Sequence, residues 1–312
     1  MKCIIDVDTG VDDAHAIALA VASPDELNII GISCVAGNGP VDLVTTATLQ
    51  VLEACNASQI NVHKGCSKPL VEEPHPCPFI HGKNCLGDLS LPHPSIKPSG
   101  IHAVTWLLET CRLSDEPICI VALAPLTNIA VAFRLEPNLM LQKIQEIHWM
   151  GGAFRAGGNY GAWTEANAGY DPEAAHIILT SGIPLIMYPW DLYTSVELSR
   201  SQVIKHDPEM RQLSSRLLIR DLNHWSMEKA MIGDAITVAC LVDPSLVLES
   251  QSYPVSIELS AGKTRGMTVF DQRLQVDPPD IPKAANNATV VTKVDVERLQ
   301  NLFISRVLNR GL

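Results

Sequence analysis

Four aspartates occur within eight residues near the N-terminus of the chain: Asp6, Asp8, Asp12 and Asp13. Carboxylates crowded in this way repel one another, so either a cation that prefers oxygen ligands neutralises them or some of them stay protonated. A purely structural role would explain one or two such acids more readily than four, and we favour the cation. The pattern does not fit an EF-hand, because position twelve counted from Asp6 is Ile17 instead of Glu.

The elements on either side of this cluster are expected to bring the acids together. Cys3 to Val7 is short, apolar and β-branched, which predicts a buried parallel strand, and the alanine-rich run from Ala14 to Ala22 predicts a helix. Alternation along the strand places the first two acids on one side near its carboxyl end. The last two fall in the first helical turn, where the helix dipole favours negative charge.

Composition indicates a large globular chain with a small-molecule partner. With 312 residues and 46% hydrophobic content, the chain can bury one large α/β core or two smaller ones. No segment resembles a linker, and the Pro-rich and His-rich segment 72–98 is interpreted as an ordered excursion. We therefore expect a single domain over residues 1–312.

Charge and cysteine usage exclude several classes of partner. A net charge of -11 argues against a nucleic-acid or anionic-membrane surface, and no apolar run is long enough for a spanning helix. Nine cysteines without CxxC spacing suit a reducing compartment, and the first strand leaves no room for a signal peptide. A cytoplasmic location is expected.

Strand and helix patterns alternate along the chain, which predicts a Rossmann-like α/β fold with a mainly parallel central sheet and helices on both faces. The expected strands are Asn28–Ala36, Ile118–Leu123, Ile144–Met150 and Pro184–Tyr188. The expected helices are Val41–Cys55, Ile101–Cys111, Thr127–Leu135 and Pro172–Thr180. Ligands in such sheets bind beyond the carboxyl ends of the strands, where the polar segments Gly37-Asn38, Ala124–Asn128, Gly151-Gly152 and Gly157–Asn167 occur.

These motifs together resemble the nucleoside hydrolase family, the inosine-uridine preferring nucleoside N-ribohydrolases. The resemblance runs nearly end to end and strengthens because the motifs occur in the same order. The segments that carry it are the Asp cluster, Val35-Ala-Gly-Asn38, Ile80-His-Gly82, Pro125-Leu-Thr-Asn-Ile-Ala130, Arg134-Leu-Glu-Pro137, Trp149-Met-Gly-Gly152, Glu165-Ala-Asn167, Asp171-Pro-Glu-Ala-Ala-His176 and Gly266-Met-Thr-Val269.

The resemblance implies calcium-dependent hydrolysis of the N-glycosidic bond of ribonucleosides, giving ribose and a free base, by a homodimer or homotetramer. The implied Ca²⁺ ligands are Asp8, Asp13, the main-chain carbonyl of Leu123 and Asp234, and Asp8 doubles as the base. The implied ribose contacts are Asp12, Asn38, Met150, Asn159, Glu165 and Asn167. For any one of these Asn residues alone, a loop-capping role is the more common explanation.

The chemistry of these residue types agrees with that assignment. Calcium can make a water more acidic, and Asp8 could take its proton as the water attacks the anomeric carbon. The transition state resembles an oxocarbenium ion, so a site rich in carboxylates also stabilises its positive charge.

The chain departs from the family pattern at the residue that helps to protonate the leaving base. Inosine- and uridine-preferring relatives carry a His before the last calcium-binding Asp, where it helps to protonate the base, and this chain has Gly233 there. Losing a general acid costs roughly 100-fold or more. The candidate replacements are His81, His224 and Trp225. The last two are equally well explained by a helix surface or an oligomer contact, and Trp163 and Trp190 are expected in the core.

Two alternatives come from other classes of protein. A haloacid-dehalogenase-like phosphatase shares the opening Asp6-Val-Asp8-Thr9, but it needs a second Asp four residues after Asp234, where this chain has Val238. The second alternative is a non-catalytic, calcium-dependent binder of nucleosides or ribose. It would retain the metal site but lack the general acid that Gly233 replaces.

Overall fold

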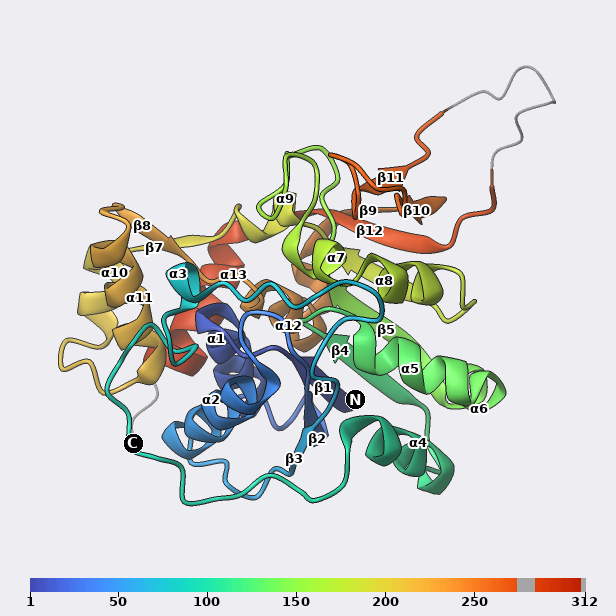
Figure 1. Cartoon of the computed structure of the whole chain (residues 1–312). Helices are drawn as coiled ribbons and strands as arrows, with labels where there is room; N and C mark the ends of the chain where they lie inside the picture. The colour runs from blue at the N-terminus through green and yellow to red at the C-terminus, as the bar shows by residue number, and fades with distance from the viewer. Residues whose placement is uncertain (274–283, 310–312) are drawn as a thin grey trace.

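An eight-stranded sheet forms the centre of the molecule, in the order β3-β2-β1-β4-β5-β6-β12-β9 (Figure 1). The structure is a computed structural model, and it describes residues 1–273 and 284–309. Neighbouring strands are parallel except β12 and β9, which are antiparallel. The strands are β1 Lys2–Val7, β2 Asn28–Cys34, β3 Val62–Lys64, β4 Ile118–Ala122, β5 Ile144–Met150, β6 Leu185–Tyr188, β9 Val247–Tyr253 and β12 Ala288–Val294.

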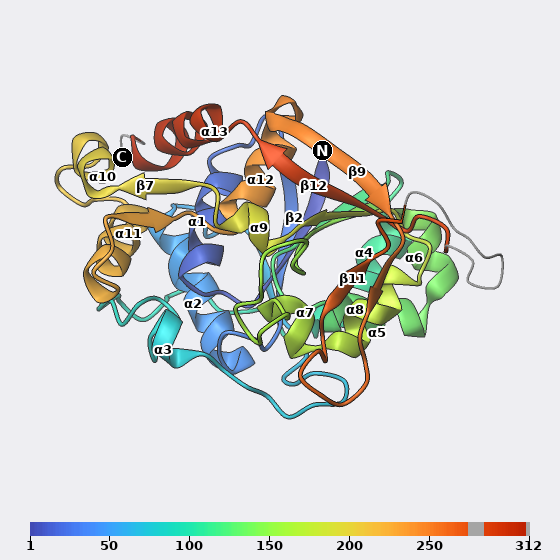
Figure 2. The same cartoon turned by 90° about the horizontal axis from the view of Figure 1, so that it is seen from above.

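Apolar cores cover both faces of this sheet. Side chains alternate across a strand, so in β1 Ile5 and Val7 join one apolar cluster and Ile4 joins the other. Helices α1, α2 and α12 contribute to the first cluster, and α4, α5 and α8 contribute to the second (Figure 2). The predicted mainly parallel sheet with helices on both faces is confirmed.

The helices connect successive strands and cover the sheet. They are α1 Val11–Val21, α2 Val41–Ala54, α3 Pro78–His81, α4 Ala103–Leu113, α5 Thr127–Leu135, α6 Pro137–Lys143, α7 Ala166–Tyr170, α8 Pro172–Leu179, α9 Trp190–Tyr193, α10 Arg200–His206, α11 Leu213–His224, α12 Ala235–Val242 and α13 Val296–Phe303. In the described ranges, each helix is too short or too polar to cross a membrane.

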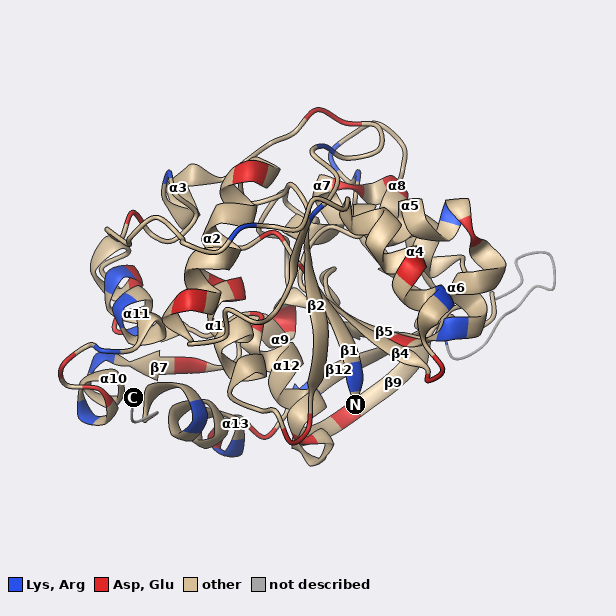
Figure 3. Cartoon of the chain, turned by 90° about the horizontal axis from the view of Figure 1, so that it is seen from below, with Lys and Arg blue, Asp and Glu red and all other residues tan. Residues whose placement is uncertain are grey.

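The chain beyond Tyr188, for which no element was predicted, adds smaller units at the margin of the sheet. Two short antiparallel pairs form there, β7 Glu197–Ser199 with β8 Lys229–Met231 and β10 Val255–Ile257 with β11 Thr268–Phe270. Seen from below, Lys and Arg residues are separated by acidic residues and form no continuous basic face within the described part of the chain (Figure 3).

Predicted and observed boundaries agree closely for the central elements. α5 and β5 have the predicted bounds, whereas α1 begins at Val11 instead of Ala14. It begins early because the Asp13 carboxylate accepts the backbone N–H of Gly10, 2.8 Å away, which satisfies a donor of the first turn. Segment 72–98 is an excursion as predicted. It contains α3 and is held to the end of β2 by a bond from Cys77 N to Asn38 O, 3.0 Å.

Candidate active site

A cavity of about 470 Å³ lies beyond the carboxyl ends of the parallel strands. Its polar lining combines carboxylates and amides: Asp8, Asp12, Asn38, Asn159, Glu165, Asn167 and Asp234. The aromatic and apolar part of the lining consists of Phe79, Ile80, Trp190, Tyr193, Trp225, Met227 and Met231. The cavity therefore offers polar groups suited to a polyol and apolar surfaces suited to a flat ring.

Asp8 is positioned by close packing between the ends of β1 and β2. One carboxylate oxygen, Oδ2, accepts the backbone N–H of Asn38 at 2.7 Å. A Cβ atom at Gly37 would lie 2.0 Å from the same oxygen, so only glycine allows this approach. Burial raises the pKa of Asp8 well above its usual range, with the charge of Asp12 adding to the effect.

Asp12, Asp13 and Asp234 bring carboxylate oxygens within 4.8 Å of one another. Oδ1 of Asp13 and Oδ1 of Asp234 are buried and have no hydrogen-bond partner. Burial raises the pKa of Asp13 and of Asp234 well above the usual range, and the neighbouring carboxylates raise it further. Unpartnered, mutually repelling carboxylate oxygens are the donor set that a hard divalent cation satisfies.

Asp6, like Asp13, does not belong to the cavity lining. Its Oδ1 accepts hydrogen bonds from the hydroxyl of Ser33 and from Nδ2 of Asn128. Burial raises the pKa of Asp6 to about 7. Asp6 thus links β1 to β2 and to the start of α5. A purely structural role, the alternative to metal binding, therefore applies to this residue.

Asn167 joins the ends of β4 and β5 in the cavity lining. Its Nδ2 donates to the main-chain carbonyls of Leu123 and Met150, each at 3.0 Å. The Leu123 carbonyl, predicted to bind the metal, therefore lies beside Met150 and Asn167, which were predicted to contact ribose. Asn159, the remaining predicted amide, caps a loop through a bond from Ala166 N to its Oδ1, 2.9 Å.

Glu165 holds the start of α7 while lining the cavity. Its Oε1 accepts the backbone N–H of Asn167 at 2.8 Å, and its Oε2 accepts those of Gly152 and Ala168 at 2.8 and 3.1 Å. Burial raises the pKa of Glu165 to about 7, against the opposing effect of these hydrogen bonds. The side chain was predicted to contact ribose, and the structure adds a capping role.

His81, on α3, lines the cavity close to Asp12. Its Nδ1 accepts the backbone N–H of Val11 at 3.2 Å and is 3.7 Å from Oδ1 of Asp12. Burial lowers the pKa of His81. A neutral ring that accepts at Nδ1 carries its proton on Nε2, where it can act as a donor.

Tyr193 was missed in the sequence. It lines the cavity, its hydroxyl donates to Oδ2 of Asp12 at 2.9 Å, and its ring stacks on Trp190 with centroids 4.7 Å apart. The available signal was a pair of aromatic residues three positions apart, directly after the strand Pro184–Tyr188. Trp190 is half-buried, packs on the core as predicted and also lines the cavity.

The other predicted aromatic and histidine residues differ in whether they line the cavity. Trp225 lines the cavity and is 44% exposed. His224 is exposed, does not belong to the lining and touches the site only through its edge-on contact with Trp225. Trp163 was expected in the core, and that prediction is wrong because its side chain is 52% exposed on the loop between β5 and α7.

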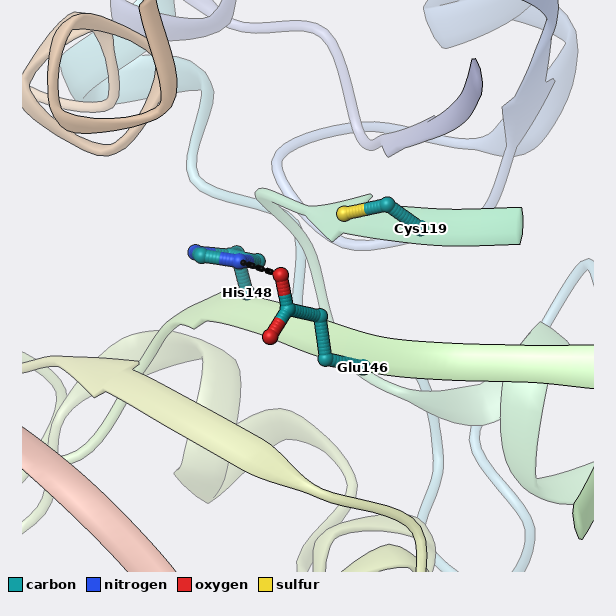
Figure 4. A group of neighbouring side chains, drawn as sticks. All are labelled: Cys119, Glu146 and His148. Carbon is teal, nitrogen blue, oxygen red and sulfur yellow. Dashed lines mark hydrogen bonds and ion pairs between the residues drawn. The ribbon is translucent and has the colours of Figure 1, made fainter. Parts of the chain in front are cut away.

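A second group of potential metal ligands lies on β4 and β5, within the sheet (Figure 4). Nε2 of His148 is 3.0 Å from Oε1 of Glu146, and its Nδ1 is 2.9 Å from the hydroxyl of Tyr188. Cys119 is a buried thiol beside them. Both ring nitrogens of His148 already have partners, so this group is explained as a hydrogen-bonded chain within the sheet.

Sequence comparison identifies the family. Residues 3–301 match the family model described as inosine-uridine preferring nucleoside hydrolase. The chain belongs to this nucleoside hydrolase family. Its reaction is therefore the hydrolysis of the N-glycosidic bond of ribonucleosides, and the phosphatase alternative is excluded. The non-catalytic binder is not supported either, because the relatives are hydrolases.

Nucleoside hydrolases that are similar to this chain differ in the base named in their descriptions. The inosine-uridine preferring nucleoside hydrolase of Leishmania major is 34% identical, with 99% of this chain and 98% of the relative covered. The pyrimidine-specific ribonucleoside hydrolase RihA of a Shewanella species is also 34% identical, with 96% and 94% covered. The purine-preferring ribonucleoside hydrolase of Gardnerella vaginalis has a TM-score of 0.87 at 29% identity, with 98% of each chain covered.

Proposed function

We propose that this nucleoside hydrolase is calcium-dependent and uses Asp8 as its general base. The unpartnered, buried oxygens of Asp13 and Asp234 carry this proposal. Asp8 and the carbonyl of Leu123 complete the oxygen ligands, since a carbonyl that accepts from Asn167 retains a second lone pair. An all-oxygen donor set suits Ca²⁺ better than a transition metal.

A calcium ion held by these residues would supply Lewis acidity to a water and neutralise the carboxylates. Asp8 accepts a proton from the attacking water while the water oxygen forms its bond to the anomeric carbon. The C–N bond breaks, its electron pair leaves with the base, and the base takes up a proton. The surrounding carboxylates stabilise the positive charge that develops on the sugar ring.

The remaining polar side chains orient the ribose. Asp12, Asn38 and Asn167 present acceptors and donors in the same cavity lining as Asp8. Fixed groups of both kinds are needed to hold adjacent hydroxyls in one orientation. Trp190 and Trp225, also in the lining, offer faces against which a nucleobase can stack.

The decisive assay uses the calcium-loaded protein with p-nitrophenyl riboside, whose leaving group needs no protonation, beside inosine, adenosine, uridine and cytidine. We expect ribose release in wild type, with the fastest nucleoside naming the preferred base. Asp8→Asn should reduce turnover of every substrate by roughly 1,000-fold or more, because the base and a metal ligand are lost together. It should also weaken calcium binding measured by calorimetry.

The matched control is Asp42→Asn, which removes an exposed carboxylate paired with Lys64 on the surface. It should behave as wild type in both measurements. Full activity of Asp8→Asn would contradict the mechanism, and absence of turnover with every riboside would contradict calcium-dependent hydrolysis itself.

We also propose that residues 1–312 form one domain and that the protein works in the cytoplasm. The first proposal is supported by the continuous central sheet, which contains both β1 from the start of the chain and β12 from its last part. The second is supported by buried free thiols such as Cys34, Cys119 and Cys240, which persist in a reducing compartment.

A further inference from the structure

Gly233, immediately before Asp234, leaves a space that Tyr193 fills. A Cβ atom at Gly233 would lie 2.7 Å from Cε2, Cζ and Oη of Tyr193, closer than any real contact. The backbone of Gly233 has a φ of +51°, a conformation that favours glycine. The two residues are therefore complementary, and any side chain at 233 would compete with the phenol ring for one place.

Tyr193 contacts both an acidic and an aromatic side chain of the cavity. Tyr193 lines both the large cavity and a small adjoining hollow of about 80 Å³, and His81 and Trp225 line the same two spaces. Its hydroxyl bonds to Asp12, a predicted ribose contact, and its ring stacks on Trp190. A hydroxyl beside a ribose contact is near the bond that joins the sugar to its base.

We propose that the Tyr193 hydroxyl donates a hydrogen bond to the departing base of the nucleoside, which makes Tyr193 a catalytic residue for leaving-group activation. This inference rests on the proposed function of the cavity. In the structure the single hydroxyl proton of Tyr193 is donated to Oδ2 of Asp12, so the step requires the O–H to turn to the base once the ribose hydroxyls donate to Asp12. As the C–N bond breaks, its electron pair passes to the ring nitrogen of the base, and the turned O–H of Tyr193 stabilises the negative charge that develops there. The proton that completes the free base comes from solvent, so the phenol remains protonated and protons balance with the one taken by Asp8.

Two further features suit Tyr193 to this role. Burial raises the pKa of Tyr193 well above its usual range, so the hydroxyl stays a donor throughout the neutral range. Asp12 holds the side chain through Oδ2, while Oδ1 faces His81 at 3.7 Å. Asp12 therefore orients Tyr193 alone, because Nδ1 of His81 accepts from Val11 and has no proton to donate to Asp12. Tyr193 supplements His81, whose proton is on Nε2, instead of excluding it.

The test compares Tyr193→Phe with wild type on two classes of substrate. With the best natural nucleoside, we expect kcat/KM to fall roughly 100-fold, the usual effect of removing one donor to a developing charge. With p-nitrophenyl riboside, whose leaving group is stable as an anion, kcat/KM should change less than about threefold by the same argument. A series of substituted phenyl ribosides should show a steeper dependence of rate on leaving-group pKa in the variant.

The matched control is Tyr188→Phe, which removes another buried hydroxyl, one that bonds to His148 away from the cavity. It should leave both substrates near wild-type rates. Equal losses of Tyr193→Phe on both substrates would overturn the inference, because they would indicate a structural role. Unchanged nucleoside turnover in Tyr193→Phe would overturn it too, as would a wild type that cleaves only the nitrophenyl compound. Failure of wild type with every riboside would instead reject the proposed function.

Discussion

Individual side chains in this cavity serve the backbone and the proposed chemistry at the same time. Glu165 accepts two backbone N–H groups at the start of α7 and a third from Gly152 after β5, and still lines the cavity. Asn167 likewise donates its amide N–H groups to two carbonyls at the ends of β4 and β5. Substrate contacts from such residues are held rigidly, because their rotamers are already fixed by bonds to the fold.

Glu165→Gln should separate these two roles. A neutral amide presents an NH₂ group to at least one of the backbone donors, so we expect the free energy of unfolding to fall by about 1–2 kcal/mol. The same change should raise KM for p-nitrophenyl riboside and lower kcat. Urea unfolding and steady-state kinetics measure the two effects, with the exposed Glu109→Gln as control. Unchanged stability would show that the cap contributes little.

At the scale of elements, helix α1 supplies both an acidic end and a buried histidine. Its first turn carries Asp12 and Asp13 toward the cavity, where the helix dipole favours negative charge. One turn further, His15 is fully buried, and neither ring nitrogen has a hydrogen-bond partner. Its ring packs edge-on against Phe303 of α13, with centroids 5.8 Å apart. The helix therefore couples the site to the C-terminal part of the core.

Burial lowers the pKa of His15 to about 4, which predicts acid sensitivity. The unfolded chain binds a proton at this residue below about pH 6.5, whereas the folded chain does not bind it until about pH 4. Stability is therefore lost as the pH falls through this interval, by about 2 kcal/mol at pH 5. We expect His15→Leu to reduce the difference in unfolding free energy between pH 7 and pH 5 by this amount.

Urea unfolding at the two pH values measures the effect, and the exposed His93→Leu serves as control. An undiminished pH dependence in His15→Leu would assign the acid sensitivity to other groups.

At the scale of the whole molecule, the sheet topology brings together acids from the first and the last third of the sequence. Asp8 follows β1 in the middle of the sheet, and Asp234 precedes α12, which packs against α1. The cluster of buried carboxylates opposes folding unless a cation or protons compensate it. The expected homodimer or homotetramer stays a prediction.

Metal removal should therefore lower the stability of the whole fold. Calcium at 100 times its dissociation constant is expected to add about 2.7 kcal/mol to the free energy of unfolding, and chelation with EGTA should remove it. Thermal unfolding with calcium, magnesium or EGTA measures this, and calcium should stabilise more than magnesium. Asp234→Asn should reduce the calcium response. Equal unfolding temperatures with calcium and EGTA would argue against a structural contribution of the ion.

The sequence by itself determined most of the central fold and the polar part of the site. Buried strands such as β5 and amphipathic helices such as α5 follow from local periodicity, which a single segment contains. The acidic cluster was equally visible, because its members lie within eight residues at one strand-to-helix turn. The family resemblance added residues that are distant in sequence, such as Asp234.

Only the tertiary structure decided which side chain meets which at the cavity. Tyr193 and Gly233 are forty positions apart, and nothing local in either segment indicates that the ring of one fills the space beside the other. Trp163 is as apolar as Trp190, yet one is exposed on a loop and the other packs on the core. Contacts of this kind arise from the packing of separate elements, which local periodicity does not encode.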